Sequence, residues 1–405
     1  MQERTQSDNR VVVVSQHYPP DKSGNAARIH DTAKFLVEEG WDVTVLAPPP
    51  EFPHGRFDRS WTRSKRDTDG GVTVYRLWAW QPAQEDPGFV GRIAYYLSFP
   101  LHALLWLIRH YREYDVVVTS SPPIFTGLAG LPFALLGRKP VVVDVRDLWI
   151  DASVGLGFIE SGSLVERASR LYEKLVLNAA EAVTVTTKEL GTRLVSSYGI
   201  DESKIVHIPN GVDTERYTGN GRSTERTIVY TGNVGHAQDL ESCIRAMDRF
   251  DDGTTLRIVG DGDIRSELEA VVGELGLEES VEFTGLVPRE EVPEILDRSA
   301  IGVAPLKDEE TLEYAVPTKA YEYMACELPV VATGRSELAS LVDAADGGVV
   351  VENDPDAFAD AFESLLSDPE YRDGLGKSGR EHVVRHYDRG VVAKRLGDLL
   401  DRVRG

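Results

Sequence analysis

The sequence predicts an α/β fold built from two doubly wound parallel sheets, and three observations lead to that fold class. Short runs of consecutive apolar residues, such as VVVV at 11–14, are typical of strands buried on both faces of a parallel sheet. Segments with a helical amphipathic pattern alternate with these runs. The 405 residues, 41% of them hydrophobic, are more than one ordinary core accommodates, so we expect two domains.

The first half begins in a strand–loop–helix–strand order, which predicts a right-handed crossover within a doubly wound sheet. Its expected strands lie at 11–15, 41–47, 72–77, 115–121, 140–145 and 182–187. The loop QHYPPDKSGNAAR precedes a helix at about 29–39. A second helix at 163–180 places Leu164, Leu171 and Leu175 on one stripe, a pattern typical of an amphipathic helix.

The second half repeats the alternation after IPNGVD at 208–213, and the domain boundary is expected within 210–225. The expected strands are TIVYTG, LRIVG, VEFTG, IGVAPL and PVVAT, with helices near 239–250, 264–275, 288–298 and from 318 onward. The predicted parts are a disordered N-terminus at 1–10, a first domain at 11–212, a second domain at 213–387, and a helix at 388–405 that packs back on the first domain.

The charge balance is strongly acidic, with 66 acidic against 44 basic residues and a net charge of −22. Such a surface repels nucleic acid, so we expect no nucleic-acid partner. We interpret the acidity as adaptation to high salt, with an ordinary acidic protein as the alternative. The two cysteines, Cys243 and Cys326, have no metal-ligand spacing, and the first ten residues lack a signal peptide's apolar core. A reducing, cytoplasmic location follows.

One apolar stretch in the first half has two interpretations. The sixteen residues that follow Arg92 contain no Asp, Glu, Lys or Arg, but they are fewer than the about 20 that a membrane helix needs, and Pro100 interrupts them. Basic residues, including Arg109, follow. The segment from Ile93 to Arg112 either rests on anionic lipid at the cytoplasmic face of a membrane or is a buried helix of the first domain.

The loop after the first strand is the first candidate for phosphate binding. Gly24 and Asn25 lead into a helix N-terminus, where glycine lets a diphosphate approach the backbone and the N–H groups favour negative charge. Arg28 falls in the first turn of that helix. The loop lacks G-x-G-x-x-G, which disfavours a dinucleotide-dependent dehydrogenase.

The second half carries a sharper set of candidates. TGNVG at 231–235 and VGDGDIRSELE at 259–269 each follow a strand and precede a helix. The two aspartates of the latter, Asp261 and Asp263, form a D-x-D, which holds a divalent metal in some enzymes. Turn formation and helix capping explain the pattern as well, and we expect no metal.

The motif PTKAYEYMA at 317–325 places three functional groups at a helix start. The N–H groups from Thr318 onward are suited to a distal phosphate, and Lys319 adds positive charge. Glu322 follows, where its carboxylate can accept hydrogen bonds from two ribose hydroxyls. A solvated amphipathic helix is the alternative.

These motifs, in this order, resemble the retaining glycosyltransferases of family 4. The resemblance rests on IPNGVD, YTGNVGHAQDLE, VGDGD, VEFTGLVPREEVPEIL and VPTKAYEYMACELPVVAT, and it covers nearly the whole chain after Arg10. The most similar subgroup transfers N-acetylated amino sugars or deoxysugars in the assembly of surface polysaccharide and lipid-linked oligosaccharide. The resemblance implies the GT-B fold, in which two Rossmann-like doubly wound domains face each other across a cleft.

The resemblance also implies roles for residues of this chain. The nucleotide-sugar donor would be a substrate, with no cofactor and no metal, and the acceptor would bind mainly to the first domain. Gly24 would approach the donor from the first domain. The residues implied to bind the donor in the second domain are Gly232, Asn233, Gly260, Leu286 and Val287, the last two through their main chain to the base, and Glu322 through the ribose.

Three departures from the family pattern bear on individual roles. The family's first glutamate is replaced by Tyr314, with Glu313 one place away, so our hypothesis is that Glu313 reaches the sugar. HAQDL at 236–240 stands where the family has an Arg and Lys pair, leaving Lys319 and Arg265 to neutralise the diphosphate. In the first domain, Arg146 replaces a histidine near the donor sugar.

Other candidates in the first domain sit at strand ends. Asp147, beside Arg146, is a candidate general base or acceptor ligand, and its position favours it over Asp144. His17, in the first loop, is a candidate contact to acceptor or sugar.

The predicted function is therefore transfer of a hexose or N-acetylhexosamine from a UDP-sugar to a glycan or lipid-linked acceptor, with retention of configuration. Two alternatives stay open. One is a nucleotide-sugar epimerase or a phosphorylase on the same fold. The other is a non-catalytic partner subunit that binds nucleotide sugar, an alternative that the displaced glutamate and the missing basic pair motivate.

Overall fold

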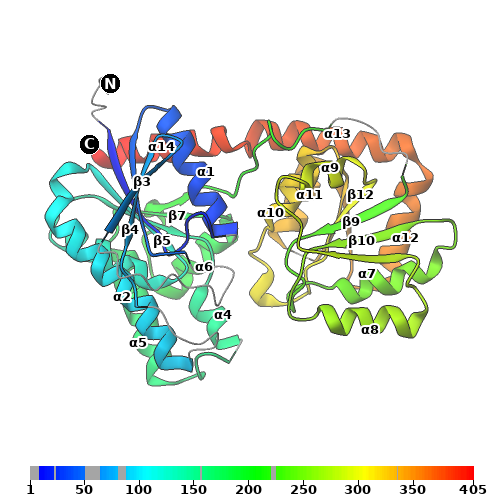
Figure 1. The fold of residues 1–405 in the computed structure, drawn as a ribbon, viewed down its shortest axis with the longest axis horizontal. Coiled ribbons are helices and arrows are strands. Elements are labelled where there is room, and N and C mark those ends of the chain that lie inside the picture. The colour runs from blue at the N-terminus through cyan, green and yellow to red at the C-terminus, as the bar shows by residue number, and fades with distance from the viewer. Residues whose placement is uncertain are drawn as a thin grey trace. The chain divides into compact units, whose positions relative to one another are not determined.

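The computed structural model divides the chain into two compact units, each built around one sheet (Figure 1). It describes residues 9–21, 24–50, 64–80, 88–155, 157–219, 225–334 and 336–405. The first unit runs to Pro209 and also contains Arg389–Gly405, and the second unit is Asn210–Asp388. The structure therefore places the boundary three residues before the expected one at 212.

The first unit has an eight-stranded sheet in the order β3-β4-β2-β1-β5-β6-β7-β8. Its strands are β1 (Arg10–Val14), β2 (Asp42–Ala47), β3 (Ser64–Asp69), β4 (Val72–Leu77), β5 (Val116–Ser121), β6 (Val141–Val145), β7 (Ala182–Val185) and β8 (Ile205–His207). Its helices are α1 (Gly24–Glu38), α2 (Gly88–His110), α3 (Gly127–Leu135), α4 (Trp149–Gly155), α5 (Leu164–Ala179), α6 (Lys188–Tyr198) and α14 (Arg389–Arg404), with short 3-10 helices η1 (Tyr111–Glu113), η2 (Ile124–Thr126) and η3 (Glu202–Lys204).

The second unit has a six-stranded, fully parallel sheet in the order β11-β10-β9-β12-β13-β14. Its strands are β9 (Thr227–Thr231), β10 (Thr255–Val259), β11 (Val281–Gly285), β12 (Ile301–Ala304), β13 (Val330–Thr333) and β14 (Gly348–Val351). Its helices are α7 (Leu240–Ala246), α8 (Arg265–Leu275), α9 (Val292–Asp297), α10 (Thr318–Ala325), α11 (Glu337–Ala345), α12 (Pro355–Ser367) and α13 (Pro369–His386), with η4 (Met247–Arg249) and η5 (Glu310–Leu312).

The doubly wound prediction is confirmed for both units, with differences at element ends. The antiparallel strand β3 was not expected, because its residues SKRDTD carry no apolar signal and pair only at the sheet edge. Helix α1 begins at Gly24, earlier than the expected residue 29. Strand β1 includes Arg10, which we had expected to be disordered; residues 1–8 of that segment, and 22–23 of the following loop, lie outside the described residues.

The last helix of the chain is part of the first unit. Helix α14 packs on α1, and its Leu399 and Leu400 join the core that contains Leu36 and Val43 (Figure 1). Arg389, at the start of α14, lies 3.2 Å from a carboxylate oxygen of Asp31 on α1. The chain therefore returns to its first unit to complete that unit's core.

Helices α2, α3 and α5 form a layer on the other face of the first sheet. Right-handed crossovers require this arrangement, because the α1 connection runs toward one sheet edge and the later connections run toward the other. Aromatic rings join the layer, since Phe125 stacks at 6.3 Å on both Tyr96 of α2 and Tyr172 of α5. Within the described residues, no helix combines the length and apolar character that crossing a membrane requires.

The predicted helix at 163–180 is confirmed as α5, but its apolar stripe faces outward. Ser163 caps its start by accepting a hydrogen bond from the N–H of Glu166. Leu171 is exposed, whereas Glu173 and Leu177 are buried. The hydroxyl of Tyr198 donates a hydrogen bond to Glu173. Burial raises the pKa of Glu173 to about 7, so its carboxyl group is protonated in acidic solution and loses its proton around neutral pH.

The buried carboxyl group predicts a pH-dependent stability of the first unit. Because the folded-state pKa lies above the ordinary 4.5, the folded state binds more protons between these two values. The stabilisation is present below pH 4.5 and is lost as the pH rises through about 7. Glu173→Gln should remove a pH-dependent component of about 1–3 kcal/mol, measured by denaturant unfolding across this range. Glu181→Gln, at an exposed position, is the control, and identical pH profiles for wild type and Glu173→Gln would contradict the assignment.

Candidate functional site

In the second unit, three neighbouring strands end at glycines that bring their main chains into contact. The N–H of Gly260, after β10, donates to the carbonyl of Gly285 at 2.9 Å, and the N–H of Gly232, after β9, donates to that of Val259 at 2.8 Å. Gly260 has a φ of +142°, and a Cβ there would lie 1.9 Å from the carbonyl oxygen of Gly232. Only glycine fits, so this strand edge presents main chain without side chains.

Lys319 reaches this glycine edge from the start of α10. Its ammonium nitrogen lies 3.6 Å from the ring centroid of Tyr230, the penultimate residue of β9. A Cβ added to Gly232 would lie 3.2 Å from the same nitrogen. The hydroxyl of Tyr323 accepts a hydrogen bond from the N–H of Thr231 at 2.7 Å and so holds α10 against the end of β9. The cation therefore has a fixed position beside the glycine edge.

The environment of Lys319 makes its charge responsive to a ligand. Burial lowers the pKa of this ammonium group to about 7, and the nearby carboxylate of Glu322 acts in the opposite direction. A lysine with this pKa gains a proton readily when an anion binds beside it.

Glu322 lies one turn along α10 and is half-buried. The pKa of Tyr217 is raised mainly by burial and further by the charge of Glu322, while Arg289 opposes the shift. These three side chains therefore interact electrostatically beside α10. The lysine and the glutamate predicted from the sequence are on one helix, with the lysine toward the glycine edge.

Arg265 begins α8 at the same strand edge. Its Nε donates to Glu269 at 2.7 Å, and Asp261 lies 3.9 Å from one of its terminal nitrogens. A Cβ on Gly285 would lie 3.2 Å from its guanidinium. Arg265 is therefore near the glycine edge, but two carboxylates already neutralise it. In the described part of the chain no three His, Cys, Asp or Glu residues are grouped as a metal would require.

The other donor-site candidates of the second unit lie around this edge. Asn233 and Thr318 are exposed, Leu286 is 79% exposed, and Val287 packs against the core. Tyr314, which stands in place of the family's first glutamate, is buried. Glu313 follows η5, is half-buried, and accepts a hydrogen bond at its carbonyl from the N–H of Glu337 at 2.9 Å.

In the first unit, a buried ion network joins β6 to the start of α1. Asp144 on β6 accepts hydrogen bonds from Arg28 at 3.3 Å, from the Nε of Arg146 at 2.9 Å and from Thr184 at 2.8 Å. Burial favours the neutral acid, but the two guanidinium groups outweigh it and hold the pKa of Asp144 below its ordinary value. This carboxylate is therefore charged and serves as the centre of the network.

Arg146 is fully engaged within this network. It also donates to the side-chain oxygen of Asn25 at 2.9 Å and to the hydroxyl of Ser120. Burial lowers its pKa to about 10, while Asp144 opposes that shift, so Arg146 stays charged at neutral pH. Arg146 positions Asn25 and the first turn of α1, which begins at Gly24.

The remaining candidates of the first unit lie in loops that follow strands. Asp147 is half-buried, between β6 and α4. His17 follows β1, and its Nδ1 lies 3.8 Å from a carboxylate oxygen of Asp21. The sequence reasoning did not select Gln16, which is 1% exposed and whose amide has no hydrogen-bond partner among the described residues. A buried amide after a strand has no sequence signal, because loop burial depends on the fold.

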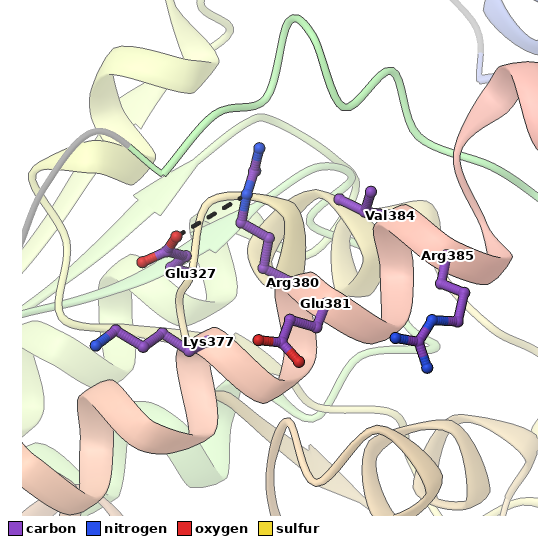
Figure 2. Close-up of a pocket in the computed structure, with 6 residues that line it drawn as sticks. All are labelled: Glu327, Lys377, Arg380, Glu381, Val384 and Arg385. Carbon is purple, nitrogen blue, oxygen red and sulfur yellow. Dashed lines mark ion pairs between the residues drawn. The ribbon is translucent and has the colours of Figure 1, made fainter.

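A hollow of about 600 Å³ lies elsewhere in the second unit (Figure 2). It is lined by Glu327, Lys377, Arg380, Glu381, Val384 and Arg385. Figure 2 shows Arg380 directed at Glu327, with 3.9 Å between Nε and the carboxylate. Arg380 also donates to the carbonyl of Tyr217 at 3.0 Å, so it joins α13 to neighbouring segments. None of the predicted site residues lines this hollow, and we assign it no function.

Two family models match the chain, one on each unit. Residues 23–211 match a model described as glycosyl transferase 4-like domain, and residues 225–368 match one described as glycosyl transferases group 1. A curated relative, the GDP-mannose-dependent alpha-(1-6)-phosphatidylinositol monomannoside mannosyltransferase of Mycolicibacterium smegmatis, is 30% identical over 365 residues, which cover 77% of this chain and 92% of the relative.

Solved structures show the same fold. Sucrose-phosphate synthase from Thermosynechococcus elongatus matches with a TM-score of 0.76 and 20% identity over 98% of this chain and 99% of its own. HepE from Anabaena, in complex with UDP-glucose, matches with a TM-score of 0.71 and 16% identity over 97% and 99%. The two Rossmann-like units are those of the GT-B fold.

Removing the carboxylate at the centre of the ion network should strongly destabilise the first unit. Asp144→Ala leaves two buried guanidinium groups without their shared partner. The free energy of unfolding of the first unit, measured with denaturant, should therefore fall by roughly 3–5 kcal/mol. Asp151→Ala breaks a pair with Arg170 whose side chains are about a third exposed and should cost roughly 0–1 kcal/mol. Equal losses for the two variants would show that the network does not hold the unit together.

Proposed function

Since the chain belongs to the GT-B glycosyltransferases, we propose that it moves a hexose or N-acetylhexosamine from a UDP-sugar to a glycan or lipid-linked acceptor with retention of configuration. The observation that carries this proposal is the glycine edge of the second unit with the Lys319 ammonium fixed beside Gly232. A diphosphate fits that combination, because bare main chain permits close approach and the cation offsets its charge.

The donor's other parts would meet residues around the same edge. Glu322 would accept hydrogen bonds from the ribose hydroxyls. The main chain at Leu286 and Val287 would meet the base, and Asn233 and Thr318 would border the diphosphate. Arg265 would add positive charge once its carboxylate partners are displaced or shared.

We propose that the reaction uses no metal, no cofactor and no protein nucleophile. The acceptor hydroxyl would form its bond to the anomeric carbon on the face from which the diphosphate leaves, and the diphosphate would take up the hydroxyl proton. The charged form of Lys319 would stabilise the diphosphate as its bond to the sugar breaks. Glu313, one residue from the buried Tyr314, is the carboxylate proposed to contact the sugar.

The names of relatives bear on the donor and the acceptor. HepE is described in complex with UDP-glucose, which supports a UDP-sugar, whereas the mycobacterial relative is named for GDP-mannose. That relative is named for a phosphatidylinositol mannoside, which supports a lipid-linked acceptor. We assign acceptor binding to the first unit, with His17 and Asp147 in contact with acceptor or sugar and Arg146 as a positioning residue.

A cytoplasmic site of action is part of the same proposal. Both cysteines are buried and free of disulfides, which fits a reducing compartment. The net charge of −22 supports function at high salt. The segment from Ile93 to Arg112 would bring the enzyme to the cytoplasmic face of a membrane.

Thermal stabilisation by ligands tests the donor site. UDP, GDP and their sugars would be compared at high potassium chloride, where a ligand at about 100 times its Kd adds about 2.7 kcal/mol of stability. We expect UDP and one UDP-sugar to stabilise the wild type. Glu322→Ala should weaken UDP binding tenfold or more, because hydrogen bonds to a charged group contribute about 1.5–3 kcal/mol. Glu274→Ala, at an exposed position on α8, is the matched control.

Two other outcomes of that experiment would change the proposed donor or the proposed donor site. Stabilisation by GDP-mannose alone would support a transferase whose donor carries GDP instead of UDP. No response to any nucleotide would overturn the donor site as described and favour a protein without catalytic activity.

The lowered pKa of Lys319 predicts that UDP binding weakens as the pH rises. Because the free lysine loses its proton above about pH 7, binding must restore that proton. The Kd should then rise by up to about tenfold per pH unit between pH 7 and 9, a range in which the phosphate is already ionised. Calorimetric titration of wild type and Lys319→Gln measures this dependence. The variant should bind more weakly at pH 7 and show little change with pH, and a flat wild-type profile would exclude direct contact between Lys319 and the diphosphate.

A further inference from the structure

Two buried polar side chains at the carboxyl ends of neighbouring strands have no hydrogen-bond partner within the described chain. Gln16 follows β1 and is 1% exposed, and neither the nitrogen nor the oxygen of its amide is bonded. Ser121 is the last residue of β5, the neighbour of β1, and its hydroxyl is likewise buried and unbonded. We refer to Gln16 and Ser121 as the amide–hydroxyl pair.

The strand register places the two members of the pair level with each other. Val14 of β1 pairs in parallel with Thr119 of β5, and Gln16 and Ser121 each lie two residues further along. Helix α3 covers the face to which Thr119 and Ser121 belong, since a Cβ added to Gly130 would lie 3.1 Å from the methyl group of Thr119. The pair therefore stands where parallel α/β sheets bind ligands, at the carboxyl ends of adjacent strands.

A buried amide without a partner is unfavourable in the free protein. Buried polar groups are almost always hydrogen-bonded, because removal from water without a new hydrogen bond raises the free energy. The neighbouring residues Ser120, Asp144 and Arg146 follow that rule, since both side chains beside Arg146 are bonded to its guanidinium. The unmet groups of the amide–hydroxyl pair therefore indicate a ligand that bonds them.

The chemistry of the pair selects an uncharged ligand that both donates and accepts. A primary amide offers two N–H donors and a carbonyl acceptor, and a hydroxyl can act in either sense. The nearby cations Arg28 and Arg146 are bonded to Asp144, so neither is available to balance a buried phosphate or carboxylate. Two adjacent hydroxyl groups of a sugar ring match the pair, because the amide can accept from one and donate to the other.

Aromatic side chains beside the pair suit the remaining part of a sugar ring. Phe125 lies four residues after Ser121, and Trp149 lies four residues after the end of β6, the next strand of the sheet. Their ring centroids are 5.6 Å apart, and Tyr96 of α2 meets Trp149 edge to face at 6.1 Å. All three rings are half-buried. Apolar rings around a few convergent polar groups are typical of small-molecule sites.

We propose that Gln16 and Ser121 determine specificity for the acceptor by holding two adjacent hydroxyl groups of its sugar ring. The amide oxygen of Gln16 would accept a hydrogen bond from one hydroxyl, and its N–H would donate to the other, which Ser121 would also contact. The inference rests on the proposed function, because it names the neutral group that the first unit recognises in the acceptor. A ring that carries a phosphate at these positions would be rejected.

Saturation-transfer NMR on the full chain tests the proposal. The probes are the methyl α-glycosides of glucose, galactose and mannose, which differ in the orientation of adjacent hydroxyls, and we expect one of them to bind the wild type. Gln16→Met keeps an unbranched side chain of similar length and should raise the Kd of that glycoside about tenfold or more, because two neutral hydrogen bonds are lost. Ser121→Ala should raise it about threefold. Glucose 6-phosphate should bind no more tightly than the neutral glycosides.

Thermal stability supplies a readout that a merely structural role would not produce. Gln16→Met removes polar atoms that have no partner, so the variant without ligand should melt at or above the wild-type temperature. Thr44→Val is the matched control in the same unit, because Thr44 accepts a hydrogen bond from the hydroxyl of Tyr114 at 3.1 Å. That control should melt at a lower temperature and keep the wild-type Kd for the glycoside.

The response to UDP separates this inference from the proposed donor site. All variants should keep the wild-type rise in melting temperature with UDP. A wild type that binds the glycoside without responding to UDP would count against the donor site alone.

Four results would overturn the inference. They are a wild type that binds none of the three glycosides, a Gln16→Met variant with an unchanged Kd, a Gln16→Met variant that melts below the wild type, and tighter binding of glucose 6-phosphate than of every neutral glycoside. The third result would show that the amide is bonded within the protein, and the fourth would show that the site takes an anion.

Discussion

The candidate donor site depends on the close approach of two main chains at Gly232 and Gly260. A side chain at Gly260 would overlap the carbonyl of Gly232, so the neighbouring ends of β9 and β10 must be bare. That requirement leaves the strand edge without side-chain cations of its own. The positive charge comes instead from Lys319 of α10, which rests on the Tyr230 ring and which Tyr323 indirectly holds in register. The geometry of the backbone therefore decides where the cation must come from.

In the first unit, the corresponding cations are buried in an ion network instead of being available to a ligand. Arg28 of α1 and Arg146, which follows β6, both donate hydrogen bonds to the buried Asp144 and so hold the start of α1 against β6. A buried carboxylate between two guanidinium groups is costly to desolvate. Thr184 donates a hydrogen bond to this carboxylate, and the side-chain oxygen of Asn25 accepts one from Arg146, so the polar atoms of the network find partners. The second unit thus has at its strand edge a lysine, Lys319, whose charge can change when an anion binds. The arginines of the first unit instead stabilise the fold by pairing with Asp144.

The surface of the first unit shows a related separation of charge. Over the whole chain acidic residues outnumber basic ones, yet Arg109 of α2 and Lys174 of α5 form no ion pair with another described residue. The same helices expose leucines on their outer side. Helix α5 even buries Glu173 while Leu171 faces solvent, so hydrophobicity alone did not set its orientation.

The sequence by itself determined the fold class and the principal strands. Runs of apolar residues mark buried strands, and glycines mark the places where the backbone turns at their ends, and both features are local in the chain. It also located Gly232, Gly260, Lys319 and Glu322 as candidates, since strand-end glycines and a helix start are visible in order along the chain. Only the tertiary structure decided that Asp144 pairs with both Arg28 and Arg146, and that the stripe of α5 faces outward. Those outcomes depend on which side chains of distant segments meet, and periodicity carries no information about which face of a helix the rest of the chain covers.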